Sequence, residues 1–324
     1  MTDFAIVARR TGGPEVLEWA ERPAGRPGPG EVLIRQTAVG LNFIDCYFRS
    51  GLYPWPGEEL IPGGEAAGVV EAMGEGVVGF AVGDRVAYTM PNGAYRTHRV
   101  VPAAWLVKLS AGVSDEIAAS IMLKGLTAHY LIHSSFRVEP GHVVLVHAAA
   151  GGVGQLLGQW LKAKGATAIG TVGGAAKVAA ARAAGYDHVI DYDSADFPDA
   201  VREITAGRGC DVVYDSVGRT TWRGSLKSLR TRGSFICFGQ SSGPLDEFRF
   251  SDLAVGSFTA NRPSLFHYVS TRDELEARAA DLFAMIGSGQ LRSQIGQRFA
   301  LKDAASAHHA LEQRQTTGAT VLLP

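Results

Sequence analysis

The sequence predicts an α/β protein with two domains, one rich in β-strands and one built on a doubly wound parallel sheet. The chain has 324 residues, which is more than one hydrophobic core usually serves. Residues 1–125 contain short apolar runs separated by glycine- and proline-rich turn signals, the pattern of a β-rich region. From about residue 126 to residue 260, strand-like and helix-like runs alternate, which indicates a parallel sheet covered by helices on both faces.

Individual elements can be assigned from these patterns. In the first region the clearest strands are three runs rich in valine and alanine: EVLIRQTAV (31–39), AAGVVEAMG (66–74) and RVAYTM (85–90). In the second region the expected strands, each followed by a helix except the last, are VVLVH (143–147), TAIGTV (167–172), HVI (188–190), DVVYDSVG (211–218) and SFICFG (234–239). After about residue 262, helical patterns follow at 271–288 and 302–314, and the sequence ends in the apolar run VLLP.

Composition and charge narrow the classes of partner. Hydrophobic residues make up 46% of the chain and the formal net charge is -1. A near-neutral chain without a basic run offers nucleic acid no electrostatic footprint and anionic membranes no anchor. The most apolar long stretch, 143–161, is interrupted by His147, Gln155 and Gln159 and is not expected to span a membrane. We therefore expect a small-molecule partner, because this composition is unlike that of proteins that bind nucleic acid or membranes.

Cysteine usage and the first residues point to a cytoplasmic location. Cys46, Cys210 and Cys237 lie far apart and no C-x-x-C pair occurs, which predicts a reducing compartment and no cysteine-rich zinc site. The first ten residues lack the apolar core of a signal peptide.

The turn after the strand at 143–147 carries a variant of the dinucleotide fingerprint, Ala149-x-Gly151-x-x-Gly154. A small first residue allows the tight turn, Gly151 lets the backbone approach a pyrophosphate, and Gly154 permits close packing of helix on strand. The helix start presents unpaired N–H groups to the anion. The motif alone is weak, and a small-residue turn without a ligand is the alternative, but it follows a strand, opens a helix and begins a βα series.

The residues after the second strand favour NADP(H) over NAD(H). NAD sites usually place an acidic residue there to hold the ribose 2′-hydroxyl, whereas this chain has Thr171-Val172-Gly173-Gly174. Lys177 follows, one turn into the next helix, where it can pair with a 2′-phosphate; a solvated helix lysine is the alternative. Tyr192, just after the third strand, is placed to line the adenosine end or to be a surface tyrosine.

Many ordered blocks carry a family resemblance. The run GHVVLVHAAAGGVGQLLGQWLK (141–162) resembles the signature of the quinone oxidoreductase/ζ-crystallin family of the medium-chain dehydrogenases/reductases. The resemblance extends over the whole chain through GGPEVLE (12–18), GLNFIDCYFRSGLYP (40–54), GGEAAGVVEAMGEGV (63–77), FAVGDRVAY (80–88), LKGLTAHYL (123–131), YDSVGR (214–219), RPSL (262–265) and TGATVLLP (317–324).

The resemblance implies a division of the chain into two domains. A GroES-like catalytic domain would comprise 1–126 and 263–324, and a Rossmann domain for NADPH would comprise 127–262, with the cofactor in the cleft between them. It also implies a homodimer formed through the Rossmann domains. The apolar stretch AVGSF (254–258) is a candidate for the sheet edge involved, although a core strand is the alternative.

The resemblance also bears on zinc. Zinc alcohol dehydrogenases of this superfamily carry a Gly-His-Glu triplet whose histidine binds the metal, and this chain has Gly63-Gly64-Glu65. Cys46 falls outside the position expected for a cysteine ligand. A catalytic zinc needs three protein ligands, and we expect none here. His308-His309 is interpreted as a polar helix face, because adjacent residues on a helix diverge.

Without a metal, the expected substrate is one that accepts electrons readily. A quinone stabilises the charge that develops on reduction by conjugation, so the protein mainly binds and orients, and the reaction is expected to proceed by hydride or single-electron transfer. By resemblance, Asn42, Tyr47 and Tyr53 line the quinone pocket. Lys124 and Thr127 lie where the family contacts the reacting carbonyl and the nicotinamide half. Packing roles for the tyrosines and a surface position for Lys124 are the alternatives.

The remaining cofactor contacts are carried over from matching family positions. They are Asn42, Asp45, Tyr130, Ala149, Gly151, Gly152, Val153, Gly154, Gly173, Gly174, Lys177, Tyr192, Ser216, Phe238, Gly239, Ser241, Ser264, Leu265 and Arg314. Gly174 departs from relatives that place serine or threonine there, which weakens the NADPH preference. No residue is assigned as the proton donor; water and a tyrosine both stay open.

Two other functions stay open. The same zinc-free fold supports reduction of the C=C bond of α,β-unsaturated aldehydes and ketones elsewhere in the superfamily. A low-turnover NADPH-binding protein, crystallin-like or RNA-binding, is a further alternative, although the near-neutral charge is unlike that of an RNA-binding protein.

Overall fold

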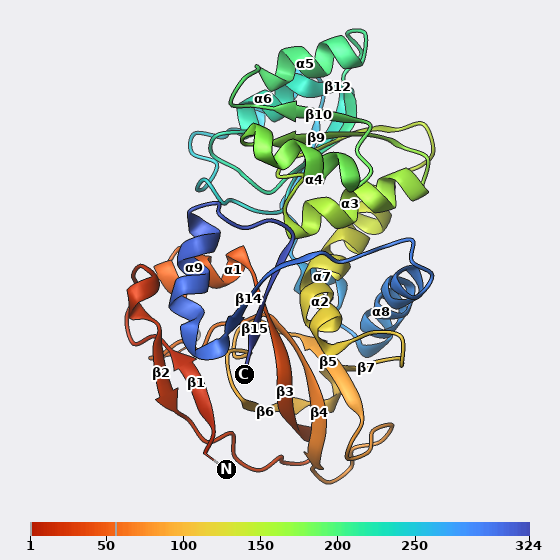
Figure 1. Cartoon of the computed structure of the whole chain (residues 1–324). Coiled ribbons are helices and arrows are strands. Elements are labelled where there is room, and N and C mark those ends of the chain that lie inside the picture. The colour runs from red at the N-terminus through yellow and green to blue at the C-terminus, as the bar shows by residue number, and fades with distance from the viewer. Residues whose placement is uncertain (1, 56) are drawn as a thin grey trace. The chain divides into compact units, whose positions relative to one another are not determined.

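The computed structural model describes residues 2–55 and 57–324, and the backbone contacts divide the chain into two compact units (Figure 1). The first unit comprises Met1–Leu126, Val269–Gly287 and Ser293–Pro324. The second unit comprises Thr127–Tyr268 and Ser288–Arg292. No helix in the described part of the chain combines the length and the apolar character that crossing a membrane requires.

The first unit is built on a mixed sheet of seven strands in the described chain, in the order β14-β15-β3-β4-β5-β7, with β6 also paired to β3. A separate antiparallel pair is formed by β1 and β2. The strands are β1 (Phe4–Val7), β2 (Glu18–Glu21), β3 (Glu31–Leu41), β4 (Glu65–Met73), β5 (Arg85–Thr89), β6 (His98–Pro102), β7 (Leu106–Lys108), β14 (Ile295–Ala300) and β15 (Ala319–Leu323).

The helices of the first unit are α1 (Phe43–Ser50), α8 (Arg272–Gly287) and α9 (Ala304–Glu312), with short 3-10 turns η1 (Pro14–Val16), η2 (Ala103–Trp105) and η6 (Leu301–Asp303). The helix α2 (Asp115–Tyr130) begins in the first unit and ends in the second, and the π-helical turn η3 (Leu131–Ser135) continues it. Because β15 pairs antiparallel with β3, the last residues of the chain belong to the core formed by the first ones.

The prediction of a mostly β first region missed α1 and the first part of α2. The helix α1 is short, but Asn42 precedes it, the Asp45 carboxylate accepts the Asn42 N–H at 2.8 Å, and Gly51 ends it with a φ of 82°. These cap signals are visible in the sequence. The helix α2 is buried on nearly all sides, so it lacks the polar face from which an amphipathic period is detected.

The second unit has the predicted parallel sheet. Within the described chain six strands lie in the order β10-β9-β8-β11-β12-β13, and every pairing is parallel. This order is that of a Rossmann fold. The elements are β8 (Val143–Val146), α3 (Gly152–Ala163), β9 (Thr167–Val172), η4 (Ala175–Lys177), α4 (Val178–Ala183), β10 (His188–Asp191), α5 (Phe197–Ile204), β11 (Cys210–Asp215), α6 (Trp222–Ser228), β12 (Leu229–Cys237), η5 (Phe250–Val255), β13 (Thr259–Asn261) and α7 (Leu265–Tyr268).

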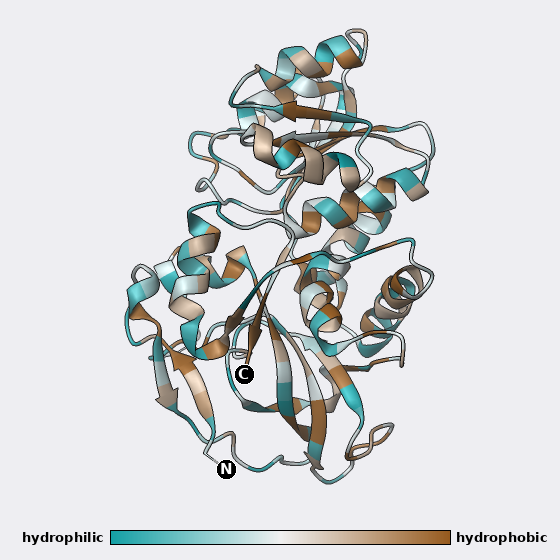
Figure 2. Cartoon of the chain, in the orientation of Figure 1, coloured by the Kyte–Doolittle hydropathy of each residue, from teal (hydrophilic) through white to brown (hydrophobic). Residues whose placement is uncertain are grey.

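Hydrophobic residues of the strands and of one side of the helices form the core of this unit. Figure 2 shows hydrophobic residues on β10 and a mixture of hydrophobic and hydrophilic residues along α5. Val201 of α5 is buried in the same cluster as Ile190 of β10 and Leu145 of β8. The mixed helices therefore cover the sheet with one side and face water with the other.

The stretch AVGSF (254–258) is not a strand, so the expectation for this segment was wrong. Val255 ends the 3-10 turn η5, Ser257 has a φ of 51°, and the edge strand is β13, which begins at Thr259. The return of the chain to the first unit comes after Tyr268 rather than after residue 262. The ring of Tyr268 stacks on that of Tyr130 at 4.4 Å, which keeps α7 in the second unit.

Gly154 lies in the first turn of α3, where the helix touches the preceding turn. A Cβ atom at this position would lie 2.3 Å from the Ala148 carbonyl oxygen and 2.8 Å from the Ala149 Cα. Both neighbours are backbone atoms and cannot rotate away. The helix can begin this close to β8 only because residue 154 has no side chain.

Gly154→Ala is therefore expected to lower the free energy of unfolding by on the order of 1–3 kcal/mol, since helix and turn must separate. Gly287→Ala in α8 is the matched control, because a Cβ there meets no atom within 4 Å. That variant should leave stability unchanged or raise it by up to about 1 kcal/mol. Denaturant unfolding measures both, and equal effects would contradict the packing argument.

Candidate active site

The glycine-rich turn has the geometry that an anion-binding turn requires. The turn starts at Ala148, whose φ is 55°, and Gly151 is the N-cap of α3. A Cβ at Gly151 would meet a single atom within 4 Å, the Ala148 carbonyl oxygen at 3.2 Å, so its other side is open. Gly152 and Val153 are only partly buried. The first N–H groups of α3 are thus accessible to a pyrophosphate, and these residues fit a dinucleotide.

Gly173, Gly174 and Tyr192, predicted for the adenosine end, lie together. A Cβ at Gly173 would come within 2.5 Å of the Tyr192 hydroxyl, so the tyrosine covers this glycine. Gly174 has a φ of 94°, and its N–H donates to the Asp191 carboxylate at 2.9 Å. This left-handed conformation explains why glycine rather than serine or threonine stands at position 174. Lys177 is partly buried at the end of η4, in the same turn region.

The loops after β11 and β12 bring together another predicted group. The Ser241 N–H donates to the Ser216 carbonyl at 3.1 Å, and a Cβ at Gly239 would lie 2.7 Å from that same carbonyl oxygen. The Phe238 N–H donates to the Asp215 carbonyl. These residues lie at the carboxyl end of the parallel sheet, the edge at which open α/β folds bind ligands.

Other predicted cofactor residues are distributed over the two units. Leu265 is buried at the start of α7, next to Ser264, in the second unit. Tyr130 is buried against Tyr268 in the same unit. Arg314 follows α9 in the first unit and has a φ of 58°. Their contacts with a cofactor stay predictions.

A fully buried carboxylate, Glu65, organises the predicted residues of the first unit. Its Oε1 accepts from the Lys124 Nζ at 2.7 Å and from the Asn42 Nδ2 at 2.9 Å, and its Oε2 accepts from the Leu123 N–H at 2.7 Å. The ammonium group and the carboxylate are both buried, so each needs the other to offset its lost hydration. The sequence did not identify Glu65 as a site residue, although it ends the Gly63-Gly64-Glu65 triplet.

Asp45 lies beside this cluster with an unusual environment. Its Oδ2 accepts from the Asn42 N–H and from the Tyr95 hydroxyl at 3.1 Å, while its Oδ1 has no hydrogen-bond partner among the described residues. Burial is the largest influence and raises the pKa of Asp45 from 3.8 to about 7. The carboxyl group therefore holds a proton for part of the time near neutral pH.

The two tyrosines predicted for the quinone pocket form a pair. The rings of Tyr47 and Tyr53 meet edge to face at 5.3 Å, and the Tyr53 N–H donates to the Tyr47 carbonyl at 3.0 Å. Tyr47 is buried on α1 and Tyr53 is half-buried in the segment that follows. Thr127 is buried on α2 in the second unit. The structure thus places Asn42, Tyr47 and Lys124 in one unit, and their roles toward a substrate stay predictions.

His308 does not lie on a polar helix face, so that interpretation was wrong for this residue. It is fully buried between α9 and α1, with its Nδ1 at 3.0 Å from the Arg49 Nη1 and its Nε2 at 3.0 Å from the Tyr95 hydroxyl. Burial and Arg49 lower the pKa of His308 to about 3. His309 is exposed, as expected. Residues 2–55 and 57–324 hold no group of three or more potential metal-ligating side chains.

These features define a class of protein. The chain has a Rossmann unit, whose glycine-rich turn fits a dinucleotide, and a second unit with a mixed β-sheet. This combination is typical of a dinucleotide-dependent dehydrogenase or reductase. Residues 28–111 match the alcohol dehydrogenase GroES-like domain, and residues 152–284 match the zinc-binding dehydrogenase domain.

Comparison with known proteins gives the family. The chain is 48% identical over 315 residues to a quinone oxidoreductase of Pseudomonas aeruginosa, covering 97% of each chain. It is 45% identical over 330 residues to a 2-haloacrylate reductase of a Burkholderia species, covering 99% of both chains. The crystal structure of Escherichia coli quinone oxidoreductase complexed with NADPH has a TM-score of 0.97 and 43% identity, over 99% of this chain and 100% of the other. The chain belongs to the quinone oxidoreductase family of the medium-chain dehydrogenases/reductases, which confirms the predicted family and fold class.

Asp45→Asn tests the protonation of the buried carboxyl group. Folding raises the pKa of Asp45. The protonated carboxyl group therefore contributes to stability in full below pH 3.8, and this contribution is lost as the pH rises through about 7. The amide keeps both acceptor contacts and cannot ionise. The variant should therefore gain stability over the wild type by on the order of a few kcal/mol at pH about 8, and much less at pH about 5.

Thermal unfolding at the two pH values measures this difference. Asp84→Asn is the control, because hydrogen bonding to Lys108 lowers the pKa of Asp84 and keeps this carboxyl group ionised across the range. Its effect on the melting temperature should not change between the two pH values. An Asp45→Asn effect that is equally independent of pH would show that Asp45 is ionised throughout.

Proposed function

We propose that the protein is an NADPH-dependent reductase of quinones, acting by hydride or single-electron transfer without a metal. The observation that carries this proposal is the near full-length similarity to quinone oxidoreductases, including one solved with NADPH, in a chain whose glycine-rich turn fits a pyrophosphate. Gly64 stands where the zinc enzymes of the superfamily have a histidine ligand, which supports the metal-free assignment.

The second unit supplies the groups that would hold the cofactor, and NADPH when bound would supply the reducing electrons. The N–H groups at Gly152 and Val153 would bind the pyrophosphate, because the Gly151 N–H already donates to the Ala148 carbonyl, and the start of α3 adds its positive partial charge. Lys177 would pair with the 2′-phosphate. Ser216 and Gly239 lie at the same sheet edge, in the loops that follow β11 and β12.

The first unit supplies groups suited to a planar acceptor. Glu65 holds the Lys124 ammonium and the Asn42 amide in fixed positions, so neither must reorganise when charge develops on an acceptor oxygen. The paired rings of Tyr47 and Tyr53 offer flat apolar surface and two hydroxyl groups. Asp45 holds a proton near neutral pH and is a candidate source for the proton that a reduced quinone takes up.

A second candidate is reduction of the C=C bond of α,β-unsaturated carbonyl compounds. The observation that favours it is the 45% identity to a 2-haloacrylate reductase over nearly the whole of both chains. Such substrates also need a group that stabilises negative charge on a carbonyl oxygen, and Lys124 would serve both reactions.

Initial rates with different acceptors decide between the two. Benzoquinone, phenanthrenequinone, a simple enal and 2-chloroacrylate are each tested with NADPH and with NADH. We expect a quinone with NADPH to give the highest kcat/KM. If the enal or the chloroacrylate far outruns both quinones, the second function is correct. If tight NADPH binding is observed with no turnover of any acceptor, neither reductase function holds.

Lys177→Ala tests the cofactor preference separately. Lys177 lies in η4, and Asp191, at the end of the neighbouring strand β10, accepts the Gly174 N–H from the start of this turn, with Asp193 two residues further on. Loss of the lysine would therefore leave carboxylates near a 2′-phosphate. The Kd for NADPH should rise about tenfold or more, while the Kd for NADH should change by less than about twofold. Lys302→Ala, which removes an exposed lysine of the first unit, is the control. Equal weakening of both cofactors would refute the 2′-phosphate role.

We also propose that the protein is a homodimer formed through the edge of the Rossmann sheet. The strand β13 is exposed along its length and pairs on one side with β12. Phe250 and Val255, in the preceding turn η5, are among the most exposed large hydrophobic side chains of the described chain. An open edge next to exposed apolar side chains is a typical surface for association.

A further inference from the structure

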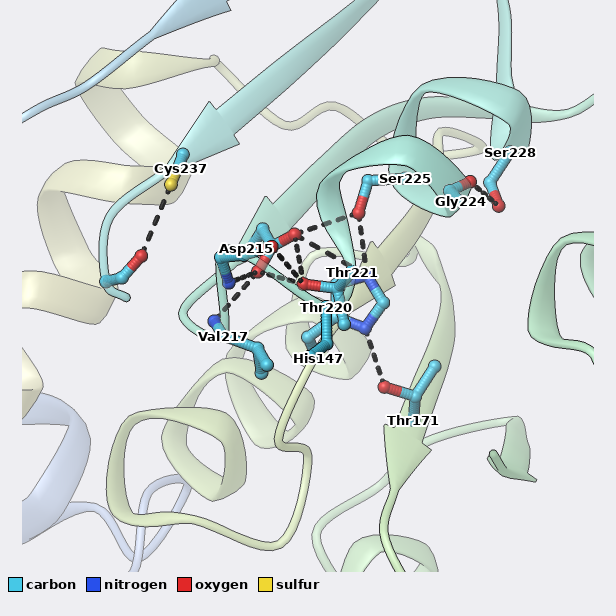
Figure 3. Close-up of polar contacts among 12 residues, drawn as sticks. His147, Thr171, Asp215, Val217, Thr220, Thr221, Gly224, Ser225, Ser228 and Cys237 are labelled. Atoms are coloured by element: carbon cyan, nitrogen blue, oxygen red, sulfur yellow. Dashed lines mark hydrogen bonds and ion pairs between the residues drawn. The ribbon is translucent and has the colours of Figure 1, made fainter. Parts of the chain in front are cut away.

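A chain of buried hydrogen bonds links three strands of the Rossmann sheet at their carboxyl ends. Figure 3 shows the His147 side chain connected to Thr171 on one side and to Ser225 and Asp215 on the other. The His147 Nδ1 lies 2.8 Å from the Thr171 Oγ1, and its Nε2 lies 2.9 Å from the Ser225 Oγ. All four side chains are buried to 1% exposure or less.

The direction of these hydrogen bonds follows from Asp215. Its two carboxylate oxygens accept from the Val217 and Gly218 N–H groups and from the Thr221 hydroxyl, and the Ser225 hydroxyl donates to Oδ2 at 2.9 Å. A carboxylate in this setting is an acceptor only. The hydrogen of Ser225 is therefore directed at Asp215, and the Ser225 oxygen accepts from His147.

This assignment fixes the state of the imidazole. His147 must carry a hydrogen on Nε2 to donate to Ser225, and burial lowers the pKa of His147, which keeps the ring neutral. The Nδ1 of the neutral ring is then a bare acceptor, and the Thr171 hydroxyl donates to it. The donor and the acceptor of each of these hydrogen bonds are therefore defined, and the Ser225 hydroxyl both accepts from His147 and donates to Asp215.

The positions of the linked residues connect this chain to the cofactor site. The strands β9, β8 and β11 are neighbours in the sheet. His147 follows β8 directly and precedes the glycine-rich turn, Thr171 lies just before the Gly173-Gly174 turn, and Asp215 ends β11 just before Ser216. The loops after β8, β9 and β11, which all carry proposed cofactor contacts, therefore each begin within two residues of a member of this hydrogen-bonded network.

We propose that His147 is a positioning residue that holds the cofactor-binding loops after β8, β9 and β11 in register through its neutral, Nε2-protonated ring. The inference rests on the proposed NADPH site. It adds that the Ser225 hydroxyl on α6 affects binding of the adenosine end of the cofactor, although His147 lies between Ser225 and the loop that follows Thr171. If these side-chain hydrogen bonds are removed, the ends of β8, β9 and β11 keep their backbone pairing. The side chains that set the positions of the loops are then no longer connected to one another.

Two conservative variants break the chain at either end of the imidazole. Ser225→Ala removes the acceptor of the Nε2 hydrogen and one donor to Asp215, and Thr171→Val replaces the other hydroxyl with a methyl group of similar size. Ser228→Ala is the matched control, because Ser228 is a fully buried serine of the same helix whose hydroxyl donates to the Gly224 carbonyl at 2.9 Å (Figure 3).

The binding readout is the Kd for NADPH and for adenosine 2′,5′-bisphosphate, which represents only the adenosine end. We expect Ser225→Ala and Thr171→Val each to weaken both ligands about tenfold, and the double variant to fall well short of the product of the two effects. Ser228→Ala should change both values by less than about twofold. If Ser225→Ala weakens NADPH but leaves the bisphosphate unchanged, Ser225 acts only on its own loop and the proposal is wrong.

Nitrogen NMR of the labelled protein without cofactor tests the imidazole directly. In the wild type the signal of His147 should show a protonated Nε2 and a bare Nδ1, and this signal should be lost or altered in Ser225→Ala and in Thr171→Val. A His147 ring protonated on Nδ1, or on both nitrogens, at neutral pH would overturn the proposal. If the wild type shows the predicted tautomer yet binds neither ligand, the proposed cofactor is wrong and the loops have no NADPH to position.

Discussion

A carboxylate that is buried away from water must be surrounded by donors, and this constraint fixes candidate site residues within each of the two units. In the first unit Glu65 gathers the Lys124 ammonium, the Asn42 amide and a backbone N–H of α2. In the second unit Asp215 gathers two backbone N–H groups and two hydroxyls. Each carboxylate fixes the residues around it because releasing any of them leaves charge unsatisfied, at a cost of several kcal/mol.

The Glu65 cluster offers a physical account of the chemistry proposed for this protein. Gly64 removes the imidazole with which the zinc enzymes bind their metal, and the residue after it keeps its carboxylate. In this chain the positive charge next to that carboxylate is Lys124, at 2.7 Å. An ammonium group partly neutralised by Glu65 polarises a carbonyl less strongly than a divalent metal does. In the proposed function it would therefore suit acceptors such as quinones, which stabilise added negative charge themselves.

The sequence predicted the parts of the structure that depend on local patterns. Alternating strand and helix signals gave the Rossmann sheet, and the spacing from Ala149 to Gly154 gave the turn that approaches β8. Family resemblance supplied Asn42 and Lys124, although nothing in their local sequence shows that they meet on Glu65. That contact joins residues far apart in the chain, which periodicity cannot reveal.

The errors have similar causes. The helix α2 was missed because it is buried on nearly all sides, and the position of His308 was wrong because its partners, Arg49 and Tyr95, come from distant segments. The segment 254–258 was expected to be an edge strand or a core strand because it is apolar, whereas the positive φ of Ser257 turns the chain before β13 begins. His147 was noted only as an interruption of an apolar run, and its hydrogen bonds to Thr171 and Ser225 became visible only in the fold.

The most direct test of the central claim is a single turnover of the chelator-treated protein. Protein with one equivalent of NADPH is mixed under anaerobic conditions with phenanthrenequinone, and the absorbance of NADPH and of the quinone is followed. The account predicts that NADPH is oxidised as the quinone is reduced, with no added metal. NADPH that stays reduced after chelation, with oxidation restored by zinc, would contradict it.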